Sequence, residues 1–135
     1  MGAWGVGAFD NDTACDWAYD LEKVGSLSVV SETLSRILDV GNEYLDADDA
    51  CVGLAACEVV ARLKGNWGQR NPYTETVDRW VASHPGIPPD EIVRKAVAVV
   101  ERVVVPPSEL LELWEEGDAT EWRNSVENLR ARVEG

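Results

Sequence analysis

Positive charge is scarce in this sequence of 135 residues. Only 12 Lys and Arg face 25 Asp and Glu, which leaves a formal net charge of -13 at pH 7. Proteins that bind DNA or RNA gain much of their affinity when Lys and Arg displace counterions from phosphates. A surface this negative repels phosphates and anionic lipid headgroups alike. We therefore expect neither a nucleic acid nor a membrane as partner.

Histidine and cysteine are also few. His84 is the sole histidine, and with Pro85 and Gly86 after it we expect a helix end or a loop there, with no Ser-His-Asp or Cys-His nucleophile. Cys51 and Cys57 lie six residues apart on an expected helix, and zinc-type Cys-x-x-Cys spacing is missing. These residue types predict no catalytic residue, no metal site and no cofactor. A glycosidase-type carboxylate pair stays open, because no spacing singles out two of the 25 acids.

Long apolar runs are missing as well. None approaches the roughly 20 residues of a membrane-spanning helix, and no basic leader with an apolar run opens the chain. The three cysteines show no paired framework, which favours a reducing compartment. We therefore expect a cytoplasmic protein.

Helical periodicity dominates what is present, and Gly and Pro separate the periodic segments. The sequence predicts an all-α fold in one domain, 1–135: a compact bundle of about seven helices around a central apolar helix, 47–64. The other predicted helices are 12–24, 28–40, 72–83, 90–105, 108–116 and 118–133. The valines of 90–105 also suit a strand, but they recur with the period of a helix.

Local signals place several helix ends. Asn11 or Asp10 is expected to cap the first helix, and Asn71 the fourth, with Pro72 at its first position. Asp118 and Glu121 have capping-box spacing for the last helix.

A homodimer is a further possibility, with either the apolar stripe of the last helix or the central helix as its interface. The stripe consists of Trp122, Val126, Leu129 and Val133.

The glycine-rich opening resembles a phosphate-binding loop that leads into a helix. A strand and the Walker Lys are missing, and Asp10 and Asp12 would repel an anion at the helix mouth. We therefore predict a structural role for Gly2, Gly5 and Gly7, in which tight turns push two aromatic rings into the core. These rings are Trp4 and Phe9.

Negative charge is concentrated in residues 1–60, where twelve acids face only Lys23 and Arg36. The main functional hypothesis is a helical interaction protein whose acidic surface meets a basic protein partner; an immunity-like or antitoxin-like role is a narrower version. The surface is expected to comprise Asp12, Asp16, Asp20, Asp46, Asp48 and Asp49. A plain solvated acidic face is the alternative. Trp67, in a polar loop, is either a binding anchor or a ring folded over the core.

An enzyme or metal-binding protein that uses Asp10, Asp12 and Asp16 is the alternative function, although calcium binding of the EF-hand type is excluded by the missing loop Gly and final Glu. Whether the protein is an enzyme stays open, and the absence of a catalytic motif argues against it.

The opening is similar to a bacterial family of unknown function, number 4259, whose members share Met-Gly-Ala-Trp-Gly followed by Phe-x-Asn-Asp-x-Ala-x-Asp. The matching residues here are Met1 to Gly5, Phe9, Asn11, Asp12, Ala14 and Asp16. Weaker similarity extends through Tyr44 and Leu45, the Ala-rich third helix and residues 108–115. The resemblance implies a small bacterial protein and no particular activity.

Overall fold

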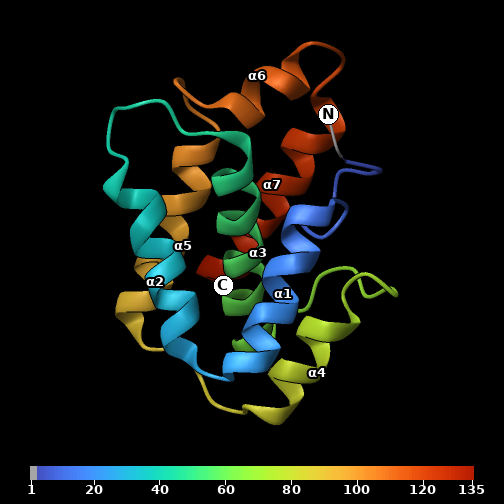
Figure 1. Ribbon diagram of the computed structural model, residues 1–135, viewed down its shortest axis with the longest axis vertical. Helices are drawn as coiled ribbons and strands as arrows, with labels where there is room; N and C mark the ends of the chain where they lie inside the picture. The colour runs from blue at the N-terminus through green and yellow to red at the C-terminus, as the bar shows by residue number, and fades with distance from the viewer. Residues whose placement is uncertain (1–2) are drawn as a thin grey trace.

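A computed structural model describes residues 3–135, which form seven helices (Figure 1). They are α1 (Asp12–Val24), α2 (Leu27–Asp39), α3 (Ala47–Leu63), α4 (Glu75–Ser83), α5 (Asp90–Val103), α6 (Glu109–Glu115) and α7 (Thr120–Glu134). Within this range no residue belongs to a β-strand; Ala3 with Asn11 and Leu45 with Ser108 form only isolated bridges. The all-α prediction is confirmed. None of the helices described combines the length and the hydrophobicity that a bilayer crossing requires.

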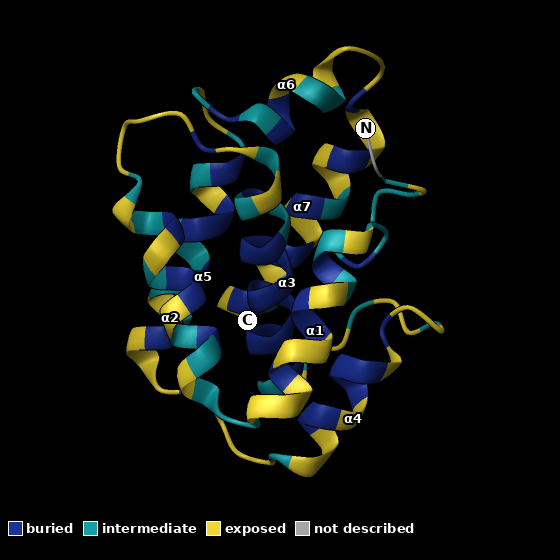
Figure 2. Cartoon of the chain, in the orientation of Figure 1, coloured by how far each residue is buried: buried dark blue, intermediate teal, exposed yellow. Residues whose placement is uncertain are grey.

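Helix α3 is the centre of the bundle, as its apolar sequence predicts. All residues from 52 to 62 are buried, and α3 contacts each of the other six helices (Figure 2). Gly53 explains how close the neighbours come: a Cβ atom there would lie 3.1 Å from side-chain carbons of Ile37 in α2 and Val99 in α5. The small residues of α3 therefore let α2 and α5 pack against its backbone.

The valine-rich segment is a helix. In α5 the buried stripe is Ile92, Ala96, Val99, Val100 and Val103. Burial of this stripe against α3, α2 and α7 outweighs the modest preference of valine for strands.

Side-chain caps position two helix starts that matter for the surface. Asn11 Oδ1 accepts from the Ala14 N–H at 2.8 Å and caps α1, and Asp46 Oδ1 accepts from the Asp49 N–H at 2.8 Å and caps α3. Each cap satisfies an N–H that has no partner within its own helix. The last residue before α2, Ser26, acts similarly toward Ser28.

Two predicted helix starts are wrong. Helix α4 begins at Glu75, because Asn71 Oδ1 accepts from the N–H groups of Tyr73 and Thr74 and so holds residues 71–74 in a separate turn. Helix α7 begins at Thr120, where Asp118 accepts only from the Thr120 N–H, so the capping box does not form.

The apolar stripe of α7 is buried inside the molecule. Trp122, Val126, Leu129 and Val133 all belong to the core. Both surfaces suggested for a homodimer, this stripe and α3, are therefore covered by the chain itself.

Candidate functional site

The N-terminal loop, residues 3–11, folds around one of its own carboxylates. The Asp10 side chain accepts from the Gly7 N–H at 3.0 Å, and Trp4 N–H donates to the Asp10 carbonyl at 2.9 Å. A Cβ atom at Gly5 would overlap the Asp10 carboxylate, and one at Gly7 would come within 2.9 Å of it. The glycines therefore make room for the Asp10 carboxylate, which accepts a hydrogen bond from the loop itself. Gly2 lies outside the described residues.

The loop directs its two aromatic rings differently. Phe9 is buried, as predicted, but Trp4 is 48% exposed, so its predicted place in the core is wrong. Ala3 lines a cavity, whereas the neighbouring Trp4 turns away from it and packs on Tyr73, with ring centroids 5.0 Å apart.

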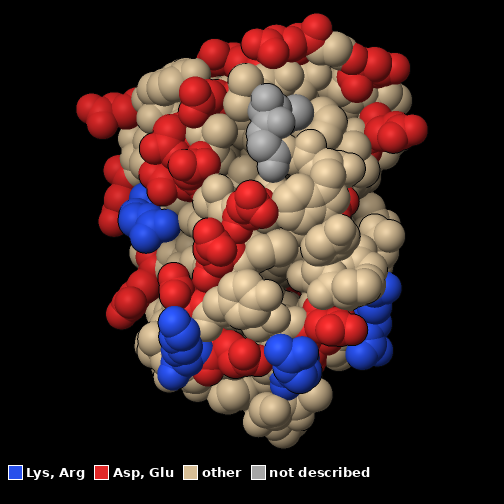
Figure 3. All heavy atoms as spheres, turned by 45° about the vertical axis from the view of Figure 1, so that its right-hand side comes forward, with Lys and Arg blue, Asp and Glu red and all other residues tan. Residues whose placement is uncertain are grey.

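The two acidic segments meet. Asp12, Asp16 and Asp20 are exposed along α1, and the Thr13 hydroxyl donates to Asp48 Oδ1 at 3.3 Å, which places the start of α1 beside the start of α3. Figure 3 shows acidic side chains along the left side and over the top of one face, while most of the Lys and Arg atoms visible there lie lower down. We call Asp12, Asp16, Asp20, Asp46, Asp48 and Asp49 the acidic surface.

Few cations neutralise the acidic surface. Asp49 lies 3.7 Å from Arg36, and among the described residues the other five carboxylates form no ion pair. The supposed metal cluster is not assembled, because Asp10 turns into the loop while Asp12 and Asp16 are exposed. Within residues 3–135, no group of three or more His, Cys, Asp or Glu is arranged to hold a metal ion.

Trp67 lies after the carboxyl end of α3, whereas Asp46, Asp48 and Asp49 lie at its amino end, about 25 Å away along the helix axis. The guanidinium carbons of Arg70 and Arg62 lie 4.6 and 5.8 Å from its ring centroid. Trp67, which is 37% exposed, thus packs its ring against two arginines and is not part of the acidic surface.

A buried charge network lies beneath the loop that carries Trp67, and the sequence analysis does not predict it. Arg62 pairs with Glu58 and with Asp78, the latter at 3.0 Å, and Arg132 of α7 pairs with Glu58 at 2.7 Å. The network joins α3, α4 and α7. One sequence signal could have revealed it: Glu58 and Arg62, spaced i and i+4, interrupt an otherwise apolar helix.

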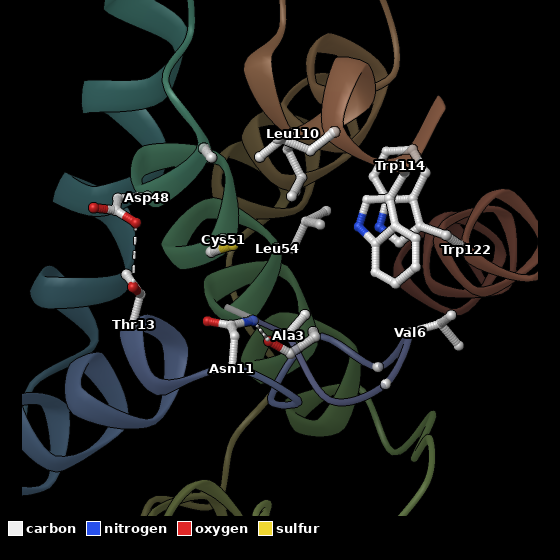
Figure 4. A pocket seen from close by; sticks show the side chains of 15 residues that line it. Ala3, Val6, Asn11, Thr13, Asp48, Cys51, Leu54, Leu110, Trp114 and Trp122 are labelled. Atoms are coloured by element: carbon white, nitrogen blue, oxygen red, sulfur yellow. Dashed lines mark hydrogen bonds between the residues drawn. The ribbon is translucent and has the colours of Figure 1, made fainter. Parts of the chain in front are cut away.

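A cavity of about 210 Å³ lies beside the N-terminal loop, and we call it the tryptophan cavity (Figure 4). The loop forms one wall, and α3, α6 and α7 form the others. The indole rings of Trp114 and Trp122 stack nearly in parallel, with centroids 6.0 Å apart and planes at 10°. Thr13, Asp48 and Cys51 supply the polar edge. Burial raises the pKa of the Cys51 thiol to about 11, with Asp48 and Asp46 adding to the effect, so this thiol is neutral at physiological pH.

The comparisons with known proteins agree with the motif in the N-terminal loop. No curated protein and no solved structure matches the chain. A family model described as "Domain of unknown function (DUF4259)" matches residues 2–125. This range contains the N-terminal loop, the acidic surface and the residues that line the tryptophan cavity. The match covers most of the sequence, and the chain therefore belongs to the DUF4259 family.

Proposed function

We propose that this protein binds a basic protein partner through its acidic surface. The observation that carries the proposal is the contact between Thr13 and Asp48, which joins the acidic ridge of α1 to the acidic amino end of α3. Carboxylates from two separate segments are thereby brought close together where α1 and α3 begin. A partner that presents Lys and Arg would meet complementary charge across this area.

Part of the acidic surface has a structural explanation and part has none. Asp46 caps α3, and Asp48 and Asp49 lie in its first turn, where negative charge interacts favourably with the helix dipole. Asp16 and Asp20 lie farther along α1 and form no ion pair among the described residues. Their i,i+4 spacing costs a few tenths of a kcal/mol through repulsion, about 0.2–0.5 for such a pair. These two residues are therefore the most diagnostic of partner binding.

Charge of this kind acts mainly on the rate of encounter and on specificity. Each exposed ion pair contributes only about 0.2–1 kcal/mol, so affinity requires several pairs or additional apolar contacts. Screening at high ionic strength weakens such an interaction. We therefore expect complex formation that falls as salt is raised.

The test is affinity capture from cell lysate at low and high salt, with identification of the retained proteins. The variant Asp16→Asn/Asp20→Asn is compared with Glu116→Gln/Glu121→Gln, which removes equal charge from exposed positions near α6 and α7. We expect the first variant to lose at least about fivefold of the retained partner, and the second to keep it. Equal retention by both variants, or retention that ignores salt, would contradict the proposal.

The narrower immunity-like or antitoxin-like form needs a separate readout. If the retained partner is a toxin or a bacteriocin-like enzyme, its activity should fall when the purified protein is added in stoichiometric amount. A retained partner whose activity is unchanged would reject this narrower form while leaving the binding result intact.

A further inference from the structure

We infer that the tryptophan cavity binds a small uncharged molecule with an apolar body and one hydrogen-bond acceptor. The inference goes beyond the proposed partner binding and does not rest on it, although Thr13 and Asp48 lie both at the acidic surface and in the cavity lining. Three features of the cavity lead to it: apolar walls, two indole N–H groups without an acceptor, and a nearby carboxylate.

The walls come from four parts of the chain. Val6 belongs to the N-terminal loop, Leu54 to α3, and Leu110 to α6, while the two stacked tryptophans close the side formed by α6 and α7 (Figure 4). Trp122 is only 2% exposed and Leu110 only 4%. A cavity with such walls favours the apolar part of a ligand, because burial removes apolar surface from water.

The indole nitrogens give the cavity a specific polar requirement. Figure 4 shows the nitrogen atoms of Trp114 and Trp122 on the ring edge that faces Leu54. Among the described residues neither nitrogen has a hydrogen-bond acceptor, whereas Trp17 Nε1 donates to Thr33 Oγ1 at 3.0 Å. Both nitrogens are open to the cavity, because among the described residues Trp80 Nε1 is the sole buried side-chain donor without a partner. A carbonyl or ether oxygen on a ligand would satisfy these donors.

Charge decides which acceptor is suitable. Asp48 lines the cavity and forms no ion pair among the described residues, and its hydrogen bond from Thr13 leaves its negative charge in place. No Lys or Arg lines the cavity, and Cys51 is a neutral thiol. A carboxylate or phosphate would be repelled and would lack a counterion. The acceptor is therefore an uncharged oxygen.

Volume limits the size of the ligand. A cavity of about 210 Å³ is smaller than the sites that hold drug-sized molecules, but it exceeds the roughly 150 Å³ cavities that bind benzene. The site therefore accommodates a molecule of roughly nine non-hydrogen atoms.

Three probes of nearly equal size test the inference: acetophenone, isopropylbenzene and benzoate. They share the phenyl ring and differ in having an uncharged acceptor, none, or an anionic one. The readout is the indole N–H region of a ¹⁵N–¹H correlation spectrum, in which each tryptophan gives one signal. The variants Trp114→Phe and Trp122→Phe each remove one signal and so assign the pair. Trp4, Trp17, Trp67 and Trp80 lie outside the cavity lining and serve as internal controls.

We expect acetophenone to shift the Trp114 and Trp122 signals downfield with saturation, and to bind at least about fivefold more tightly than isopropylbenzene, the factor that one net hydrogen bond provides. Benzoate should bind at least about tenfold more weakly than acetophenone. The half-buried Ala47 lines the cavity, so Ala47→Leu should abolish the shifts, while Ala131→Leu, exposed on α7, should not.

Absence of saturable shifts in the unmodified protein would overturn the inference. Shifts spread over all six indole signals, or benzoate binding as tightly as acetophenone, would overturn it as well. These outcomes require only the wild-type protein, so the test holds even if Ala47→Leu fails to fold.

Discussion

Arg132 of α7 holds Glu58 of α3 through two hydrogen bonds, from Nη2 to Oε1 at 2.7 Å and from Nη1 to Oε2 at 3.0 Å. Arg62 pairs with the same carboxylate and is itself almost fully buried. Removing Glu58 would therefore leave the largely buried Arg132 without its carboxylate partner and Arg62 with Asp78 alone. We expect Glu58→Ala to lower the free energy of unfolding by about 3–5 kcal/mol.

The matched control for this prediction is Glu127→Ala. Glu127 is exposed and lies 3.9 Å from Arg130, so its loss should change stability by less than about 0.5 kcal/mol. Urea unfolding of both variants measures the difference. A Glu58→Ala variant as stable as the control would show that the network does not stabilise the fold.

Gly5 is expected to be intolerant of a side chain because of Asp10. A Cβ atom at Gly5 would overlap the Asp10 carboxylate, whereas a Cβ atom at Gly117 would meet nothing within 4 Å. We expect Gly5→Ala to cost about 1–3 kcal/mol of stability and Gly117→Ala less than about 0.5 kcal/mol. In an Asp10→Ala background the cost of Gly5→Ala should fall by at least about 1 kcal/mol, which thermal unfolding of the double-mutant cycle measures. Additive costs would refute the coupling.

The raised pKa of the Cys51 thiol predicts that the folded protein loses stability at alkaline pH. Burial raises its pKa from 9.0 to about 11, so the folded protein keeps the thiol proton that the unfolded chain releases first. This contribution is complete below pH 9 and is lost as pH rises through 11, by roughly 3 kcal/mol at most. Urea unfolding between pH 7 and pH 11 should show a shallower decline for Cys51→Ala than for the wild type. Parallel curves would argue against a raised pKa.

Trp80 should tolerate phenylalanine better than Trp17 does. Trp80 Nε1 is buried without a hydrogen-bond partner among the described residues, although its ring stacks on His84 with centroids 4.3 Å apart. Trp80→Phe removes that unsatisfied donor, which offsets the lost volume, and should cost less than about 1 kcal/mol. Trp17→Phe breaks the bond to Thr33 and should cost at least about 1 kcal/mol more, as measured by chemical denaturation. Equal costs would contradict the prediction.

The helices could be predicted from the sequence because their signals are local. The apolar residues of α1 recur with a helical period behind the Asn11 cap, and its predicted range, 12–24, agrees with the structure. The wrongly predicted start of α4 also has a local cause. Asn71 and Pro72 are also typical of a turn, and only the competing hydrogen bonds to Tyr73 and Thr74 decide between the two.

The candidate sites could be predicted only in part, because they depend on residues far apart in the chain. The acidic residues are visible in the sequence, but the contact between Thr13 and Asp48 is not. The sequence places Trp122 on the apolar stripe of α7, and nothing in that stripe indicates that Trp114 stacks on it. Contacts of this kind arise when separate helices pack, so no periodic pattern within one segment encodes them.

The central position of α3 also bears on how the molecule opens. Because α3 contacts every other helix, its amide hydrogens are shielded until all of its neighbours separate. Deuterium should therefore reach them only through global unfolding, whereas the ends of α6 and α7 should exchange through local fraying. Exchange rates in α3 would thus report the stability of the entire bundle.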